Sequence, residues 1–166
     1  EGLMSLLALQ LRNFDKILGH NKEKIRFKVI GNRLGLSDSL QKAIAQMEEK
    51  TKNNTQLTAL IAINYGGRDE IVHSVKSVVN EVVTRNIGLN EIDEKLIESF
   101  LYTADIPDPD LLIRTSGEER ISNFLLWQLA YTEFVFDDCL WPDFTSENLI
   151  EAVRIYSKRQ RRFGGA

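Results

Sequence analysis

The first third of the chain alternates between helix-like and strand-like patterns. Apolar side chains recur at helical spacing over residues 3–18, and Gly19 follows as a stop signal. Over residues 25–31 apolar and charged side chains alternate one by one, which predicts a strand. Ser37 or Asp38 can cap a second helix. The apolar stripe of that helix consists of Leu40, Ala43, Ile44 and Met47.

The middle of the chain repeats the order of strand and then helix. Residues 57–64 are nearly all apolar and bounded by turn-forming residues. This pattern is typical of a strand covered on both faces, as in a parallel sheet. A short helix is expected around residues 93–100. Before it, helical spacing predicts a longer helix with the stripe Ile71, Val75, Val78, Val79 and Val82.

The last third predicts two short strands and two helices. Residues 110–115 form a strand-like run, followed by a polar loop and a helix that is expected to begin at Ser122–Asn123. A short strand over residues 134–136 follows, and Thr145 or Ser146 can cap the final helix. Strands alternating with helices predict an α/β fold with a mainly parallel central sheet flanked by helices, as a single domain over residues 1–166.

Composition narrows the functional classes. The chain has 166 residues, of which 43% are hydrophobic and 27% charged, as in a soluble globular protein. A net charge of −3 offers no basic face for nucleic acid. Cys139 is the single cysteine, so an internal disulfide is excluded and a reducing cytoplasm is expected. No apolar run reaches the ~18 residues of a membrane span.

Polar and cationic residues gather where the predicted strand over residues 110–115 ends. Ligands of open α/β sheets bind beyond the carboxyl ends of strands, and Arg114 lies at such an end. Gly117 gives the loop room to turn, and Arg120 and Ser122 add a guanidinium and a hydroxyl near a helix start. This set predicts a diphosphate-binding cradle. A surface loop with ordinary arginines and a capped helix is an equally open alternative.

Other polar features have simpler interpretations. Asp137 and Asp138 precede the helix-interrupting pair Trp141-Pro142, which favours turn positions over a metal-binding helix. His20 and His73 lie far apart without ligand spacing and are expected at the surface. The chain has neither a P-loop lysine motif nor a GxGxxG motif, so the sequence gives little support to nucleotide binding.

Three segments carry a resemblance to a known family. Along the chain they are "NNTQLTALIAINYGGRDEIV", "PDPDLLIRTSGEERISNFLLWQLAYTEFVFDDCLWPDF" and the closing "RRFGG", in the same order as in the family. The segment over residues 107–144 resembles the C-terminal signature of the cis-prenyltransferases, the bacterial undecaprenyl diphosphate synthases above all. The similarity runs through essentially the whole chain and corresponds to the C-terminal two-thirds of the family.

The resemblance implies a Mg²⁺-dependent transferase. Family enzymes add isopentenyl diphosphate to an allylic diphosphate, such as farnesyl diphosphate, and make a long cis-polyprenyl diphosphate such as undecaprenyl diphosphate. Residue by residue, it implies that Arg114, Arg120 and Ser122 hold the diphosphate of isopentenyl diphosphate. Glu133 would help to place Mg²⁺, reaching in from the partner subunit, and Leu57 would lie near the closed end of the product tunnel.

The resemblance also implies a homodimer. Arg162 and Gly164 of the tail would reach the neighbouring subunit's active site, although "KRQRR" at 158–162 also suits a simple helix end. The apolar run with Leu125, Leu126, Phe134 and Phe136 would supply the dimer contact. The expected location is the cytoplasm, with at most peripheral contact at the inner membrane face during product release.

The chain also departs from the family pattern. The "MDGNGRW"-type motif with the catalytic aspartate and the "STENW"-type motif do not occur in it. The resemblance therefore implies that the catalytic aspartate lies upstream of Glu1, and that residues 1–166 alone would not elongate prenyl diphosphates. A non-catalytic partner subunit of a heteromeric enzyme is the alternative, and the intact set of Arg114, Arg120 and Ser122 favours the enzyme.

Overall fold

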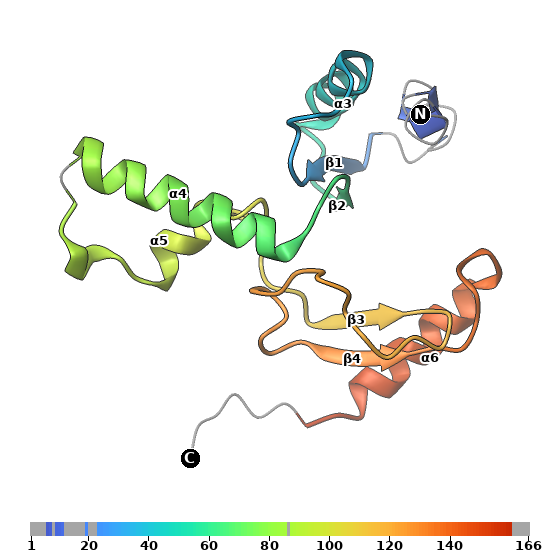
Figure 1. Ribbon diagram of the computed structural model, residues 1–166. Helices are drawn as coiled ribbons and strands as arrows, with labels where there is room; N and C mark the ends of the chain where they lie inside the picture. The colour runs from blue at the N-terminus through green and yellow to red at the C-terminus, as the bar shows by residue number, and fades with distance from the viewer. Residues whose placement is uncertain (1–5, 8, 12–18, 20–22, 86, 161–166) are drawn as a thin grey trace. The chain divides into compact units, whose positions relative to one another are not determined.

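The computed structural model describes residues 6–7, 9–11, 19, 23–85 and 87–160. The chain divides into two compact units, Glu1–Ala104 and Asp105–Ala166, and each unit is built on one pair of parallel strands (Figure 1). The predicted α/β class with parallel strands flanked by helices is confirmed. The prediction of a single domain over residues 1–166 stays a prediction.

The first unit begins with a strand–helix–strand motif. Strand β1 (Ile25–Ile30) pairs in parallel with β2 (Leu57–Ala62), in the register Ile25 with Leu57 through Ile30 with Ala62. Helix α3 (Asp38–Thr51) connects the two strands. Ser37 is its N-cap, because its side chain accepts a hydrogen bond from the backbone N–H of Leu40. The strand over residues 25–31 and the capped helix are therefore confirmed.

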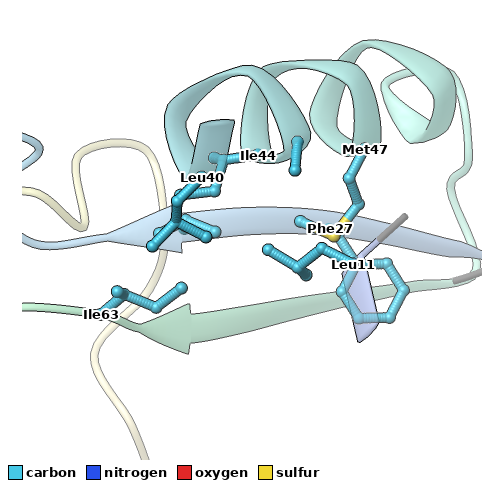
Figure 2. Packing of buried hydrophobic residues seen from close by; sticks show 8 residues of the cluster. Leu11, Phe27, Leu40, Ile44, Met47 and Ile63 are labelled. Atoms are coloured by element: carbon cyan, nitrogen blue, oxygen red, sulfur yellow. The ribbon is translucent and has the colours of Figure 1, made fainter. Parts of the chain in front are cut away.

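The core of the first unit lies between α3 and the strand pair. Leu40, Ile44 and Met47 point from the helix toward the strands, where Phe27 and Ile63 meet them (Figure 2). Leu40 and Ile44 are completely buried, as the helical stripe predicted. Of the first predicted helix, the described positions 6, 7 and 9–11 are helical and Leu11 joins this core. The rest of residues 3–18 lies outside the described residues, as does His20.

Side chains of α3 also cover the outer edge of β1. The backbone N–H groups of Phe27 and Val29 point away from β2, because alternate N–H groups of a strand face opposite neighbours. Thr51 Oγ1 accepts from Phe27 N at 3.0 Å, and Glu48 Oε1 accepts from Val29 N at 2.8 Å. The helix therefore satisfies donors that an edge strand would otherwise present to another chain.

Strand β2 is less covered than its sequence predicted. The prediction that it is buried on both faces is wrong for the described residues, because Leu57 is 57% exposed and the rest of the strand is half-buried or exposed. Helix α3 packs mainly on β1, so β2 receives only part of its cover. The strand itself is confirmed over residues 57–62.

Helix α4 (Gly67–Arg85) is confirmed, but only part of the predicted stripe is buried. The buried face consists of Val78 from the stripe with Glu70 and Ser74, whereas Val75 and Val79 of the stripe are exposed. The reason is contact with α5 (Glu94–Glu98), which packs on this face: Ser74 Oγ donates to the carbonyl of Ile97 at 2.7 Å. A short 3-10 helix, η2 (Leu89–Glu91), precedes α5.

The second unit joins its two strands without a regular helix. Strand β3 (Leu111–Arg114) pairs in parallel with β4 (Glu133–Phe136), and α6 (Ser146–Ser157), with Thr145 as N-cap, packs against β4. A 3-10 helix, η3 (Trp141–Asp143), lies between β4 and α6. Both strands and the final helix are confirmed. No helix in the described part of the chain is long and apolar enough to cross a membrane.

The helix predicted to begin at Ser122–Asn123 is wrong. The chain forms successive turns from there to residue 131. Ser122, Asn123 and Leu125 have positive φ angles of 47°, 65° and 46°, which lie in the left-handed region. A right-handed helix cannot run through such residues, so only single turns form, such as the bond from Leu129 N to the carbonyl of Leu125 at 3.0 Å.

Candidate functional site

The loop after β3 is tied to the loop after β4 by backbone hydrogen bonds. Ser116 N donates to the carbonyl of Cys139 at 2.8 Å, and Gly117 N donates to the carbonyl of Asp137 at 3.0 Å. Gly117 has φ +64°, and a Cβ there would lie 3.0 Å from Asp138 Oδ1. The glycine therefore allows the close approach that fixes the start of the loop. As predicted, Asp137 and Asp138 lie in irregular structure outside any helix.

Arg114, Arg120 and Ser122 are brought together at the carboxyl end of β3, as the sequence predicted. Arg114 Nη1 donates to Ser122 Oγ at 3.2 Å and to the backbone carbonyl oxygen of Arg120. All three residues line one hollow of about 510 Å³, together with Thr115 and Ser116. One guanidinium, that of Arg114, therefore contacts both the backbone of Arg120 and the hydroxyl of Ser122, and the Arg120 side chain lines the same hollow.

The charge balance of the hollow is positive. Its ionisable lining residues are Arg114, Arg120 and Glu118. The guanidinium of Arg120 forms an ion pair with the Glu118 carboxylate, and its side chain is 64% exposed. Planar guanidinium groups suit bidentate contact with phosphate oxygens. The arrangement can therefore hold a small, highly charged anion.

Strained backbone gathers around the hollow. Ser116 has φ 73°, and Ser122, Asn123 and Leu125 also have positive φ angles. Non-glycine residues in this region cost on the order of 1–3 kcal/mol each, and they concentrate at functional sites. Because turns replace the predicted helix, the helix N-terminus that was expected to attract the anion is not there. The guanidinium groups and the loop itself must supply the attraction.

Glu133 lies apart from the arginines within one chain. In the parallel register, Glu133 pairs with Leu111 at the start of the strands, whereas Arg114 pairs with Phe136 at their end. This offset corresponds to ~10 Å along a strand. Glu133 Oε2 accepts a hydrogen bond from Arg159 Nη1 at 2.7 Å, which forms an ion pair. The structure therefore does not bring Glu133 into the hollow of its own chain.

The remaining predicted site residues lie elsewhere. Leu57 begins β2 in the first unit, and Arg162 and Gly164 lie outside the described residues. Among the described residues, no group of three or more His, Cys, Asp or Glu side chains could hold a metal ion. His73 is exposed, as predicted, and stacks on Tyr102 with ring centroids 5.0 Å apart. The part of the chain that is described thus holds no complete metal centre.

Sequence reasoning missed a second hollow, at the carboxyl end of β1. It has a volume of about 580 Å³, and Arg33, Asp69, His73, Lys76 and Tyr102 are among its lining residues. Burial raises the pKa of Tyr102 to about 12, and the neighbouring Asp69 carboxylate, which accepts from the Tyr102 hydroxyl at 3.2 Å, adds to the shift.

A signal for this second hollow was present in the sequence. Gly31 follows β1 directly, with φ +118°, and a Cβ there would lie 2.2 Å from the carbonyl oxygen of Ile63. A glycine just after a strand marks a sharp turn at the edge where ligands of parallel sheets bind. Gly117 occupies a comparable place after β3.

Comparison with known proteins identifies the family to which the chain is similar. The family model described as putative undecaprenyl diphosphate synthase matches residues 1–164. The isoprenyl transferase of Staphylococcus saprophyticus is 49% identical over 163 residues, which are 98% of this chain and 63% of the relative. The farnesyl-diphosphate-specific ditrans,polycis-undecaprenyl-diphosphate synthase of Micrococcus luteus is 49% identical over 144 residues, which are 87% of this chain and 58% of the relative. The chain thus spans about three-fifths of the length of these relatives.

Two solved structures also match nearly the whole chain. Lavandulyl diphosphate synthase from Lavandula x intermedia, in complex with dimethylallyl diphosphate, matches with a TM-score of 0.91 and 38% identity, over 98% of this chain and 70% of that one. A probable undecaprenyl diphosphate synthase from Campylobacter jejuni matches with a TM-score of 0.78 and 33% identity, over 98% and 71%. The chain therefore belongs to the undecaprenyl diphosphate synthase family of cis-prenyltransferases.

Proposed function

We propose that the protein condenses isopentenyl diphosphate with an allylic diphosphate and makes a long cis-polyprenyl diphosphate. The observation that carries the proposal is the convergence of Arg114, Arg120 and Ser122 on one hollow at the end of β3. The Micrococcus luteus relative is named for a farnesyl diphosphate starter and an undecaprenyl product. This name supports farnesyl diphosphate as starter and undecaprenyl diphosphate as product.

The cationic hollow would act by holding isopentenyl diphosphate in place. In the reaction the allylic C–O bond breaks, and its electron pair leaves with the allylic diphosphate. The double bond of isopentenyl diphosphate supplies the electrons of the new C–C bond, and the added unit then loses a proton. Anchoring the diphosphate through Arg120 and Ser122 keeps the double bond close to the allylic carbon, which supplies much of the rate. Arg114 also fixes the backbone of Arg120 through its carbonyl.

Glu133 fits a shared magnesium site rather than a complete one. Mg²⁺ prefers oxygen ligands, keeps several waters and is commonly held by one or two carboxylates together with substrate phosphates. The Glu133 carboxylate, whose side chain is 26% exposed, could supply one such ligand after parting from Arg159. When bound, Mg²⁺ would neutralise the charge of the diphosphates. By holding the metal ion, Glu133 would help to position the diphosphates near the arginines of the hollow.

The separation between Glu133 and Arg114 supports a homodimer. Because the two residues lie at opposite ends of the β3–β4 pair, Glu133 could serve a hollow only if a second copy presents it. Arg159, which precedes Arg162 and Gly164 closely in the chain, is in contact with Glu133. The tail therefore starts beside the residue that would reach the partner. The aromatic pair Phe134–Phe136, with Leu125 and Leu126, would supply apolar dimer contact.

Two further assignments belong to the same proposal. Leu57 would line the tunnel for the growing chain, and its 57% exposure leaves room for an apolar ligand on β2. The enzyme would work in the cytoplasm, with peripheral membrane contact at product release. The relatives described above are named for transferases and synthases, and they lend no support to the alternative of a non-catalytic partner subunit.

Subunit mixing tests the assignment of Arg120 and Glu133 together. The assay is incorporation of labelled isopentenyl diphosphate onto farnesyl diphosphate with Mg²⁺, by the protein that carries this sequence. Arg120→Ala removes a charged hydrogen bond worth about 1.5–3 kcal/mol and should lower activity about tenfold to more than a hundredfold. Glu133→Gln should lower activity because the metal loses a charged ligand. Each variant alone is therefore poorly active.

Mixing the two variants distinguishes the chain to which each residue belongs. A mixed dimer has one site with both changes and one site with neither, if Glu133 acts across the interface. Activity should then recover to about a quarter of the wild-type level after random exchange of subunits. No recovery would place Glu133 in the site of its own chain. Unchanged kinetics of the Arg120→Ala variant would contradict the proposed function itself.

A further inference from the structure

Hydrogen bonds hold the backbone at two points, just before Arg120 and at Arg120 itself. Before it, Ser116 and Gly117 are bonded to the loop after β4. At Arg120 itself, the guanidinium of Arg114 holds the backbone carbonyl. The segment between them therefore has little freedom in its main chain, and the direction of the Arg120 side chain depends on its own contacts.

Glu118 supplies the ion pair that holds this side chain. Its carboxylate contacts Arg120 Nη1, and it is the ion-pair partner of Arg120 within the described ranges. Both residues line the hollow, so the pair borders the space that an anion would occupy. An anion that binds the Arg120 guanidinium must therefore displace the Glu118 carboxylate or share the guanidinium with it.

The pair is exposed enough to open. The side chain of Arg120 is 64% exposed and that of Glu118 is 39% exposed. Exposed ion pairs contribute little to stability, because water screens both charges. A charged hydrogen bond from Arg120 to a diphosphate is stronger than such a pair. A diphosphate can therefore replace the Glu118 carboxylate, at a small cost in affinity.

We propose that Glu118 is an internal competitor for the diphosphate site. It keeps the Arg120 guanidinium in the hollow while no substrate is bound, and it lowers the affinity for isopentenyl diphosphate by occupying the same donors. The inference rests on the proposed function, because it takes the anion to be the diphosphate of that substrate. A lower affinity also favours the release of a diphosphate product from the same donors.

Glu119 is a matched control. It is exposed, and it forms none of the ion pairs found among the described residues. Glu118→Gln and Glu119→Gln each remove one negative charge from adjacent positions of one loop. Their long-range effects on the potential at the hollow are therefore similar, and they differ in the direct contact with Arg120.

Calorimetric titration with isopentenyl diphosphate tests the proposal, with and without Mg²⁺. Glu118→Gln should bind about two- to fivefold more tightly than the wild type, which corresponds to the loss of an exposed ion pair. Glu119→Gln should show a smaller change. In the double variant Glu118→Gln/Arg120→Ala, the affinity should equal that of Arg120→Ala, because the competitor has no guanidinium left to occupy. Thermal melting of each variant checks that it is folded.

The outcomes separate this inference from the proposed function. If Arg120→Ala binds isopentenyl diphosphate as the wild type does, the assignment of the diphosphate site fails. If Arg120→Ala binds weakly but Glu118→Gln equals Glu119→Gln, only the role of Glu118 is overturned. Weaker binding of isopentenyl diphosphate by Glu118→Gln, seen only when Mg²⁺ is present, would also overturn the role of Glu118. Glu118 would then assist the binding of the metal–diphosphate complex.

Discussion

The two parallel strand pairs share one local arrangement, but the arginine of each pair has a different kind of partner. Each has a hollow at the carboxyl end of its first strand, a glycine in the left-handed region and an arginine that lines the hollow. In the first unit, Arg33 Nη2 donates to Glu48 Oε1 at 2.7 Å and to the carbonyl of Val29 at 3.3 Å. Glu48 is itself held by Val29 N. That arginine is therefore part of the edge of β1.

In the second unit the partner of the arginine lies in a loop. Arg120 pairs with Glu118, two residues away, and no strand edge depends on that pair. The difference teaches that an arginine at the end of a strand does not by itself define an anion site. What matters is whether its partner belongs to the core, where removing the contact costs stability, or to the loop, where a ligand can replace it.

The first unit also uses its buried polar groups for structure. Glu70 is completely buried, accepts from Tyr65 Oη at 2.5 Å and from Tyr102 N at 2.8 Å, and so ties the start of α4 to the segment after α5. A buried carboxylate with such partners stabilises one arrangement of the backbone. The Arg120 side chain, by contrast, is exposed and pairs with an exposed carboxylate.

The largest expected effect concerns the edge of β1. Thr51→Val keeps the shape of a side chain that is 2% exposed and removes the acceptor of Phe27 N. The loss of this buried hydrogen bond should lower the free energy of unfolding by about 0.5–1.5 kcal/mol. Urea unfolding measures it. Thr58→Val, at an exposed position of β2, is the control and should change stability little.

A result in which both threonine variants unfold alike would contradict the structural role of α3 at this edge. The polar groups at the edge of β1 would then not be needed for stability, and the first unit would not differ from the second in this respect.

A smaller effect is expected from Tyr102 at high pH. Because its pKa is raised to about 12 in the folded chain, an unfolded chain, with a pKa near 10, binds fewer protons between these values. The contribution of Tyr102 to stability is therefore complete below pH ~10 and is lost as the pH rises toward 12. Absorbance titration should show a late component of tyrosinate formation that belongs to Tyr102.

Tyr102→Phe provides the control for this titration. The late component of tyrosinate absorbance should disappear in the variant, and stability should fall less between pH ~10 and 12 than in the wild type. A late component of the same size in Tyr102→Phe and in the wild type would show that the environment assigned to Tyr102 is wrong.

Periodicity predicted the regular elements because their side chains face a core. The stripe Leu40, Ala43, Ile44 and Met47 identified α3, and alternation identified β1. The predicted stripe of α4 was right for Val78 and wrong for Val75 and Val79. Ser74 and Glu70 are buried instead, through hydrogen bonds that no hydrophobic pattern records. The turns after Ser122 were missed for a related reason: apolar composition suggested a helix, while positive φ angles at Ser122, Asn123 and Leu125 exclude one.

The sequence predicted the position of the candidate site, but not the contacts between its side chains. The position of Arg114 at a strand end, with Arg120 and Ser122 close behind, was enough to predict the convergence. The pairing of Glu118 with Arg120 was not predictable, since it depends on how the loop is tied at Gly117. The hollow near Tyr102 depends on residues from β1, α4 and the segment after α5, which no local pattern connects.

The most direct test of the account compares the two arginines in one binding measurement. Isopentenyl diphosphate is titrated by calorimetry into the wild type, Arg120→Ala and Arg33→Ala. The account predicts that Arg120→Ala weakens binding about tenfold or more. It predicts that Arg33→Ala leaves the affinity unchanged and lowers the free energy of unfolding by ~1 kcal/mol or less. Loss of binding in Arg33→Ala, with wild-type affinity in Arg120→Ala, would contradict it.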